Sequence, residues 1–304
     1  MGPSSKAALE AHLACCTLCP RRCRARRLRG ARGVCGAADE LRVARAALHF
    51  WEEPPLSGDA GSGAVFFSHC PLHCAYCQNA PIANGRVGAD ISIARLARIF
   101  LELQERGALN VNLVTATQYA PQVLYAVEDA RRAGLRLPIV WNTSGYETPE
   151  TVRLVSSFVD VFLTDMRYAR RETAQAYSHA PDYPEVARAA LAAMARTDAD
   201  IIVRILLLPD HLDEAKDNVR YLHETYGDRI VLSMMSQYTP LRRCPAHPEL
   251  ERRVRAADYE ELLDFADSIG CDDYFWQQGD AAQESFVPDF FSLEGVCGPE
   301  LVVE

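Results

Sequence analysis

Short apolar runs alternate with longer amphipathic stretches along most of the chain. Strand-like segments are expected at 64–68, 110–115, 138–142, 159–164, 201–207 and 230–235. Helical patterns separate them at about 91–107, 119–134, 148–157, 184–196 and 213–226. This alternation is typical of a parallel sheet with crossover helices. Six such units predict an α/β fold, a partial (β/α)6 TIM-like barrel.

The first fifty residues follow a different pattern. A short helix is expected at 7–14 and a strand at 43–49, with an Arg- and Gly-rich segment between them. We therefore expect two parts, a small cysteine-rich amino-terminal module at 1–50 and a barrel with a carboxy-terminal extension at 51–304.

A glycine-rich stretch, Gly58-x2-Gly61-x-Gly63, follows Glu52-Glu53-Pro54-Pro55. A phosphate-binding loop should follow a strand and open a helix, whereas this stretch precedes a strand. The stretch is therefore interpreted as a turn that brings the backbone close to the mouth of the barrel.

Composition narrows the class of protein. The chain has 304 residues, of which 49% are hydrophobic, enough for a sizeable core. It contains no apolar run of transmembrane length and begins without the apolar region of a secretory signal. Eight of the eleven cysteines lie before residue 78 in metal-like spacings. These features predict a cytoplasmic protein that does not bind membranes and that holds metal in a reducing compartment.

The net charge of −9 is unevenly distributed. Residues 1–40 carry eight basic and three acidic side chains, so this segment is at +5 and the remainder at −14. Basic ends can bind nucleic acid. No aromatic residues lie between these arginines, so stacking on single-stranded bases is not expected. A solvated face, or a face docked against the acidic body, is the better interpretation.

Three cysteines lie shortly after the apolar run at 64–67, at the spacing Cys70-x3-Cys74-x2-Cys77. Thiolates suit zinc and iron-sulfur clusters, and structural zinc needs four ligands. A cubane cluster held by three cysteines keeps one iron open for a substrate or cofactor. The alternatives are a zinc knuckle completed by His69 or His73, and three ordinary buried cysteines.

A second cysteine group lies in the amino-terminal module. Its members Cys16, Cys19, Cys23 and Cys35 could close a tetrahedral site and staple a segment too short for its own core. A structural zinc, an accessory iron-sulfur cluster that relays electrons, and unmetallated thiols all remain open.

The Cys70–Cys77 motif, with Tyr76 directly before its last cysteine, resembles the cluster motif of radical S-adenosylmethionine (SAM) enzymes. Further phrases resemble the pyruvate formate-lyase-activating-enzyme-related group of that superfamily. They are Cys16-Thr17-Leu18-Cys19-Pro20-Arg21, His49-Phe50-Trp51-Glu52-Glu53-Pro54, Ser57-Gly58-Asp59-Ala60-Gly61-Ser62-Gly63, Asn142-Thr143-Ser144-Gly145-Tyr146 and Met235-Ser236-Gln237-Tyr238.

The resemblance implies which residues bind the cofactors. Cys70, Cys74 and Cys77 would be the catalytic ligands of a 4Fe-4S cluster. The SAM contacts would be Tyr76, Thr115, Thr117, Asn142, Ser144, Asp165, Arg167, Arg204 and Gln237. Thr115-Ala116-Thr117 stands where relatives often have Gly-Gly-Glu to contact the SAM amino group. Arg204 would pair with the SAM carboxylate, because the Arg fork suits carboxylates.

The resemblance also implies the chemistry. An electron from a flavodoxin or ferredoxin would cleave SAM to methionine and a 5′-deoxyadenosyl radical, which abstracts a hydrogen atom from a substrate. The enzyme would be an activating-enzyme-like oxidoreductase. Its substrate would be a glycyl-radical protein in one version, and a small molecule or peptide in the other. The alternative from another class is a zinc-binding adaptor whose Arg-rich segment binds RNA.

Overall fold

The computed structural model describes residues 3–277 and 288–297. One nine-stranded sheet, in the order β3-β1-β2-β4-β5-β6-β7-β8-β9, forms its centre. The strands are β1 Leu41–His49, β2 Ser62–Phe67, β3 Ala89–Ile91, β4 Val111–Val114, β5 Ile139–Thr143, β6 Val161–Asp165, β7 Asp200–Leu206, β8 Val231–Met235 and β9 Tyr274–Trp276.

The six central strands, β2 and β4 to β8, are parallel, as the alternation in the sequence predicted. All six residues of β2 and all four of β4 are buried, as expected for parallel strands covered on both faces. β9 extends the parallel set, whereas β1 pairs with β2 in the antiparallel sense. The fold is an α/β fold with a parallel-dominated sheet, and the prediction of this class is confirmed.

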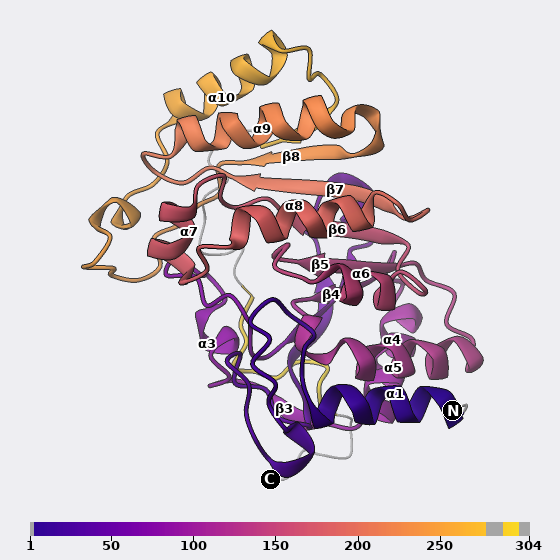
Figure 1. Ribbon diagram of the computed structural model, residues 1–304. Helices are drawn as coiled ribbons and strands as arrows, with labels where there is room; N and C mark the ends of the chain where they lie inside the picture. Colours follow the sequence, from indigo (N-terminus) through magenta and orange to yellow (C-terminus); the bar gives the residue numbers. More distant parts are fainter. Residues whose placement is uncertain (1–2, 278–287, 298–304) are drawn as a thin grey trace.

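Helices follow the strands and cover the outside of the curved sheet. Figure 1 shows α5, α6, α8 and α9 alongside the stacked strands. The helices are α1 Pro3–Ala14, α2 Pro54–Ser57, α3 Ala80–Ala83, α4 Ile93–Glu105, α5 Ala120–Arg132, α6 Pro149–Val155, α7 Arg171–Ser178, α8 Tyr183–Met194, α9 Leu212–Tyr226 and α10 Ala256–Ser268. None of the helices in the described ranges is long and apolar enough to span a membrane.

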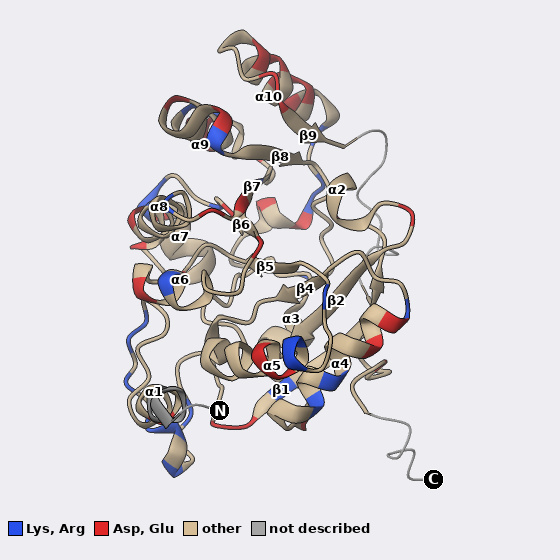
Figure 2. Cartoon of the chain, turned by 90° about the vertical axis from the view of Figure 1, so that its right-hand side faces the viewer, with Lys and Arg blue, Asp and Glu red and all other residues tan. Residues whose placement is uncertain are grey.

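The short helix α2 lies on the inner side of the sheet (Figure 2). Leu56 packs there with Val140, Leu163 and Ile202, which belong to three neighbouring strands. The Asn110 side chain donates to the Leu56 carbonyl at 2.7 Å. Helix α2 therefore fills the end of the barrel at which the parallel strands begin.

The position of α2 corrects the interpretation of the glycine-rich stretch. Gly58 and Gly61 have φ angles of 43° and 89° and make the turn between α2 and β2. They lie at the amino end of the parallel strands and not at the mouth. Glu52 and Glu53, just before the helix, reach Arg204 in the interior.

The amino-terminal segment packs closely against the barrel. Its boundary, predicted at residue 50, falls after β1, a strand that the structure places inside the sheet. The Thr151 hydroxyl of α6 donates to the Leu18 carbonyl at 2.6 Å, and Arg21 Nε donates to the Pro71 carbonyl at 3.0 Å. Residues 15–40 therefore form a lobe fixed onto the barrel.

Candidate active site

The three cysteines of the motif lie on the loop that leaves the carboxyl end of β2. Two loop residues, His69 and His73, have positive φ angles of 72° and 56°, a conformation uncommon outside glycine. Backbone bonds fix the loop: the His69 N–H donates to the Ile82 carbonyl at 2.8 Å and the Cys77 N–H to the Cys74 carbonyl at 3.1 Å. The loop therefore presents its thiols in one defined conformation.

The histidines of the loop contact neighbouring segments. A Cβ atom on Gly36 would lie 2.8 Å from Nδ1 of His69, and one on Gly85 would lie 2.2 Å from its Cε1. Burial, followed by the charges of Arg32 and Arg42, lowers the pKa of His69 to about 4. Nε2 of His73 lies 3.2 Å from the Val34 carbonyl oxygen. Both rings thus join the loop to its surroundings.

Hydrogen-bond donors approach the thiols of the motif. The Leu72 N–H lies 3.4 Å from Cys70 Sγ, and Arg167 Nη1 lies 3.4 Å from Cys74 Sγ. Burial, followed by the neighbouring thiols Cys74 and Cys70, raises the pKa of Cys77 to about 12. A thiolate here therefore needs a cationic partner, which a metal centre supplies. The donor set fits a thiolate-ligated cluster.

The cysteine motif does not have the geometry of a site for a single metal ion. Within residues 3–277 and 288–297, no three His, Cys, Asp or Glu side chains form a group that could hold one metal ion. Zinc would require its sulfurs to converge at ~2.3 Å from one point. A four-iron cluster is larger than one ion and does not require that convergence.

A cleft opens beside the motif at the carboxyl ends of the strands. The cleft is open to solvent on one side. Most residues predicted to bind SAM line this cleft: Tyr76, Thr115, Asn142, Ser144, Asp165, Arg167, Arg204 and Gln237, together with Cys77 of the motif. The barrel thus brings together side chains that are up to 161 positions apart, from Tyr76 to Gln237.

Thr115 lines the cleft in a strained conformation. Its φ angle is 60°, which is unusual for a β-branched residue and typical of functional sites. Its N–H donates to the Asn142 carbonyl at 2.9 Å. Gln118 Nε2 lies 2.8 Å from the Thr115 carbonyl and 3.0 and 3.1 Å from those of Ser68 and His69. Gln118 therefore ties the loop after β4 to the cysteine loop.

Thr117 does not line the cleft, in contrast to its predicted role. Its hydroxyl donates to Glu147 Oε1 at 2.6 Å, and Trp141 Nε1 donates to the same oxygen at 2.8 Å. Burial raises the pKa of Glu147, and the hydrogen bonds from Thr117 and Trp141 oppose this rise. The side chain of Thr117 thus satisfies a buried carboxyl group and is not available to a ligand.

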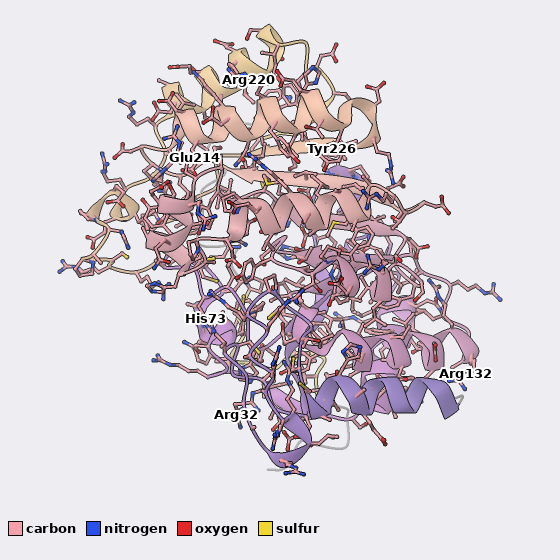
Figure 3. All side chains as sticks on the ribbon, in the orientation of Figure 1. Arg32, His73, Arg132, Glu214, Arg220 and Tyr226 are labelled. Atoms are coloured by element: carbon pink, nitrogen blue, oxygen red, sulfur yellow. The ribbon has the colours of Figure 1, made fainter. Side chains whose placement is uncertain are left out.

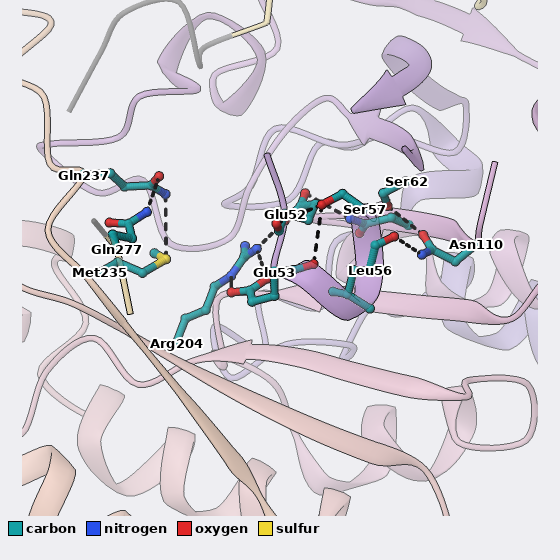
Figure 4. Close-up of polar contacts among 11 residues, drawn as sticks. Glu52, Glu53, Leu56, Ser57, Ser62, Asn110, Arg204, Met235, Gln237 and Gln277 are labelled. Atoms are coloured by element: carbon teal, nitrogen blue, oxygen red, sulfur yellow. Dashed lines mark hydrogen bonds and ion pairs between the residues drawn. The ribbon is translucent and has the colours of Figure 1, made fainter. Parts of the chain in front are cut away.

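Arg204 lines the cleft, but its guanidinium is already paired. It donates to Glu53 Oε1 from Nε at 2.7 Å and to Glu53 Oε2 from Nη2 at 2.6 Å, and it also contacts Glu52 (Figure 4). Two carboxylates of the chain thus occupy the fork that was predicted to pair with the SAM carboxylate. Burial would raise the pKa of Glu53, but its pairing with Arg204 produces a net lowering.

Glu52 is a cleft residue for which the sequence predicted no role. Its carboxylate accepts from Asn112 Nδ2 at 3.0 Å and faces the cleft. Glu52 and Glu53 together outweigh the single charge of Arg204, so this group has one excess negative charge. The sequence contained one signal for this role, the acidic pair directly before Pro54-Pro55. Prolines begin α2, and this fixes the two acids at the amino end of the helix.

The other charged pair of the cleft is neutral overall. Asp165 ends β6, and its Oδ2 accepts from Arg167 Nη2 at 2.5 Å. The same guanidinium lies 5.9 Å from the centre of the Tyr76 ring, besides its contact with Cys74. Arg167 therefore links the cysteine loop to the fourth central strand.

The far wall of the cleft is polar. Gln237 follows β8, and its Oε1 accepts from Gln277 Nε2 at 2.9 Å (Figure 4). Asn142 and Ser144 lie at the end of β5, and both side chains line the cleft. These groups can donate to a carboxylate, and they can donate to or accept from the hydroxyls of a ribose.

Comparison with known proteins identifies the family. The family model of the radical SAM superfamily matches residues 64–222, just over half of the chain. A curated relative, the uncharacterized protein MJ0674 of Methanocaldococcus jannaschii, is 27% identical over 264 residues, which cover 84% of this chain and 75% of that protein.

Two solved structures are similar in fold. SuiB of Streptococcus suis, bound to S-adenosylmethionine, has a TM-score of 0.47 at 12% identity and covers 69% of this chain. TsrM, a radical SAM methyltransferase of Kitasatospora setae with cobalamin and a [4Fe-4S] cluster, has a TM-score of 0.46 at 13% identity, also over 69% of this chain. The chain spans about half the length of these two proteins, 48% and 53% respectively.

The family match begins within β2 and includes the cysteine loop and four of the strand ends that line the cleft. The chain therefore belongs to the radical SAM superfamily, whose cofactors are a 4Fe-4S cluster and SAM.

Proposed function

We propose that this protein is an oxidoreductase that reductively cleaves SAM and abstracts a hydrogen atom from a substrate bound in the cleft. The observation that carries the proposal is that Cys77 and Tyr76 of the cysteine motif share one cleft with side chains from the ends of five parallel strands. When bound, the cofactors supply a 5′-deoxyadenosyl radical, formed by one-electron reduction of SAM.

The residues of the chain orient and shield the cofactors. Cys70, Cys74 and Cys77 hold the cluster, and Arg167 and the Leu72 N–H donate to sulfurs of that set. The excess negative charge of Glu52, Glu53 and Arg204 suits the sulfonium and ammonium groups of SAM. Asn142, Ser144 and Gln237 offer hydrogen bonds to its ribose and carboxylate.

For the substrate, we favour a small molecule or peptide over a glycyl-radical protein. Thr115-Ala116-Thr117 and Gln237 depart from the activating-enzyme pattern, in which Gly-Gly-Glu and a histidine stand at these places. A flavodoxin or ferredoxin is the proposed electron donor, and the cytoplasm the proposed location.

Anaerobic reconstitution tests the proposal. We expect wild-type protein given dithionite and SAM to release 5′-deoxyadenosine. Cys77→Ser should release none and lose about four irons per chain, because three cysteines are needed to hold the cubane. Cys244→Ser, a half-buried thiol outside the motif, is the matched control and should retain both.

Two results would decide against the proposal. One is a wild-type protein that contains zinc alone and leaves SAM intact; the other is a Cys77→Ser protein as active as wild type. The substrate class is tested separately, by transfer of deuterium from a labelled substrate into 5′-deoxyadenosine. A glycyl-radical signal on a partner protein would instead favour the activase version.

A further inference from the structure

The four cysteines of the amino-terminal lobe lie together in the folded chain. Cys16, Cys19 and Cys35 are buried, and Cys23 is half-buried. A Cβ atom placed on Gly33 would lie 3.2 Å from Cys23 Sγ and 3.4 Å from Cys35 Sγ, so these two sulfurs flank one point. Cys23 also packs against the buried cluster that contains Cys16, and the Arg22 N–H donates to the Cys19 carbonyl at 3.0 Å in the turn that joins Cys19 to Cys23. The four thiols therefore form one group.

A buried cation faces this group. Arg27 is 1% exposed, its Nη1 donates to the Gln118 carbonyl at 2.5 Å, and its Nη2 lies 3.6 Å from Cys35 Sγ. Its Nε is buried without a hydrogen-bond partner. In the described ranges, no carboxylate lies within ion-pair distance of this guanidinium.

The charge of Arg27 requires an anion. A guanidinium stays protonated in proteins, and a buried charge without a counter-ion is strongly unfavourable. The sulfur of Cys35 lies 3.6 Å from Nη2 of this guanidinium, so an anionic centre held by these cysteines would supply the counter-ion. A dicationic four-iron cluster held by four thiolates keeps a net negative charge. Such a centre would pair with Arg27.

The group lies against the cysteine loop of the active site. Nε2 of His73 is 3.2 Å from the Val34 carbonyl, Arg21 Nε donates to the Pro71 carbonyl at 3.0 Å, and His69 packs on Gly36. Zinc does not change its oxidation state, whereas an iron-sulfur cluster does. An iron-sulfur cluster at this position, unlike zinc, can pass an electron to a cluster held by the cysteine loop.

Exposed arginines surround the same group. Arg22, Arg24, Arg26, Arg29 and Arg32 are exposed, and we call them the basic collar. Lys and Arg gather on the segment that follows α1 (Figure 2). Leu28 and Val34 add exposed apolar surface, at 48% and 53%. A charged rim with apolar residues suits transient docking of a small acidic protein.

We propose that Cys16, Cys19, Cys23 and Cys35 hold a second iron-sulfur cluster, which accepts electrons from an acidic donor protein docked on the basic collar. One electron leaves the reduced donor and reduces this cluster. It then passes to the cluster of Cys70, Cys74 and Cys77, which reduces SAM. The electron-transfer role rests on the proposed function, whereas the metal content does not.

Metal content tests the site without any need for activity. The variant with Cys70→Ser, Cys74→Ser and Cys77→Ser should keep about four irons and four sulfides per chain, with a paramagnetic signal after dithionite reduction. Adding Cys16→Ser and Cys35→Ser should abolish both. Zinc alone, or no metal, in the first variant would overturn the proposal; because that variant retains the lobe cysteines, the result does not depend on whether the second variant folds.

Docking is tested in the same triple variant, where SAM cleavage plays no part. Replacing the basic collar by glutamines should slow reduction by an acidic ferredoxin at low ionic strength by about tenfold or more. The matched control replaces five exposed arginines elsewhere: Arg98, Arg132, Arg136, Arg220 and Arg252. Figure 3 shows Arg132 and Arg220 far from Arg32.

The two variants should differ only in their response to the protein donor. Reduction by dithionite should be unchanged in both, and the control should keep the salt dependence of the wild-type rate. A collar variant reduced by ferredoxin as fast as the control would overturn the docking site. Failure to cleave SAM in the wild type, with these results intact, would point instead to failure of the proposed function.

Discussion

The guanidinium of Arg204 pairs with two carboxylates, those of Glu52 and Glu53. Both acids are nearly inaccessible, with side-chain exposures of 6% for Glu52 and 4% for Glu53. Coulomb attraction in such a place is strong, but so is the cost of removing charge from water. The group therefore depends on every partner being present.

Replacement of Arg204 by methionine should destabilise the fold by about 3–5 kcal/mol, because it leaves buried carboxylates without their counter-ion. Urea unfolding at neutral pH measures this loss. Arg153→Met, which removes an exposed ion pair with Glu150, is the control and should cost no more than about 1 kcal/mol. Equal losses in the two variants would contradict the structural role of Arg204.

The difference should also depend on pH. The folded-state pKa of Glu53 is lowered, so its pairing contributes stability above the ordinary carboxyl pKa and loses it as the pH falls through the folded value. The gap between wild type and Arg204→Met should therefore narrow below about pH 4.5. A gap that widens on acidification would be inconsistent with the pairing.

One side chain of the short helix Thr117–Tyr119 joins two loops of the active site. Gln118 donates to carbonyls on the cysteine loop and on the loop after β4. The next glutamine along the chain, Gln122, is equally buried but donates to the Asp39 carbonyl at 3.3 Å. Comparing variants of Gln118 and Gln122 therefore separates the effect of losing a buried amide from the effect of losing the contacts to the active-site loops.

Gln118→Met should leave three carbonyls of the active-site loops without this donor and loosen the cysteine loop. We expect iron to be lost faster from this variant on exposure to a chelator, with the loss followed by absorbance. Gln122→Met, of similar volume and burial, should retain iron at the wild-type rate. If both variants lose iron alike, Gln118 has no special role in positioning the loop.

The lobe and the barrel meet at His69, which packs between glycines of two segments. Gly36→Ala should push the new methyl group into this ring and cost about 1–3 kcal/mol through overpacking, beyond the backbone strain at positive φ. Gly30→Ala shares the positive φ but has open space around it. Thermal unfolding should show a larger loss of stability in Gly36→Ala than in Gly30→Ala. Equal losses would mean that His69 does not pack tightly against Gly36.

The architecture and most residues of the cleft could be predicted from the sequence. Strands buried on both faces produce continuous apolar runs, so all six central strands were predicted within about two residues. Polar residues just past those strands were predicted to meet, because parallel strands end at one edge. Thr115, Asn142 and Gln237 follow this rule.

Residue partners were harder to predict. Thr117 is two residues from Thr115, yet a turn of helix directs it to Glu147. Arg204 was expected to pair with the SAM carboxylate, because the sequence did not reveal that its carboxylate partners come from a segment 151 residues earlier in the chain. Spacing along one strand carries no information about a carboxylate that comes from another element.

The contacts that secure the amino-terminal lobe have a consequence for the order of folding. Arg27 bonds a carbonyl 91 residues ahead and Arg21 one 157 residues ahead, and such distant contacts form only after long loops have closed. The amino-terminal lobe should therefore be fixed late in folding. Its cysteines would stay accessible until the central strands have paired, so loading of the proposed second cluster would coincide with completion of the barrel.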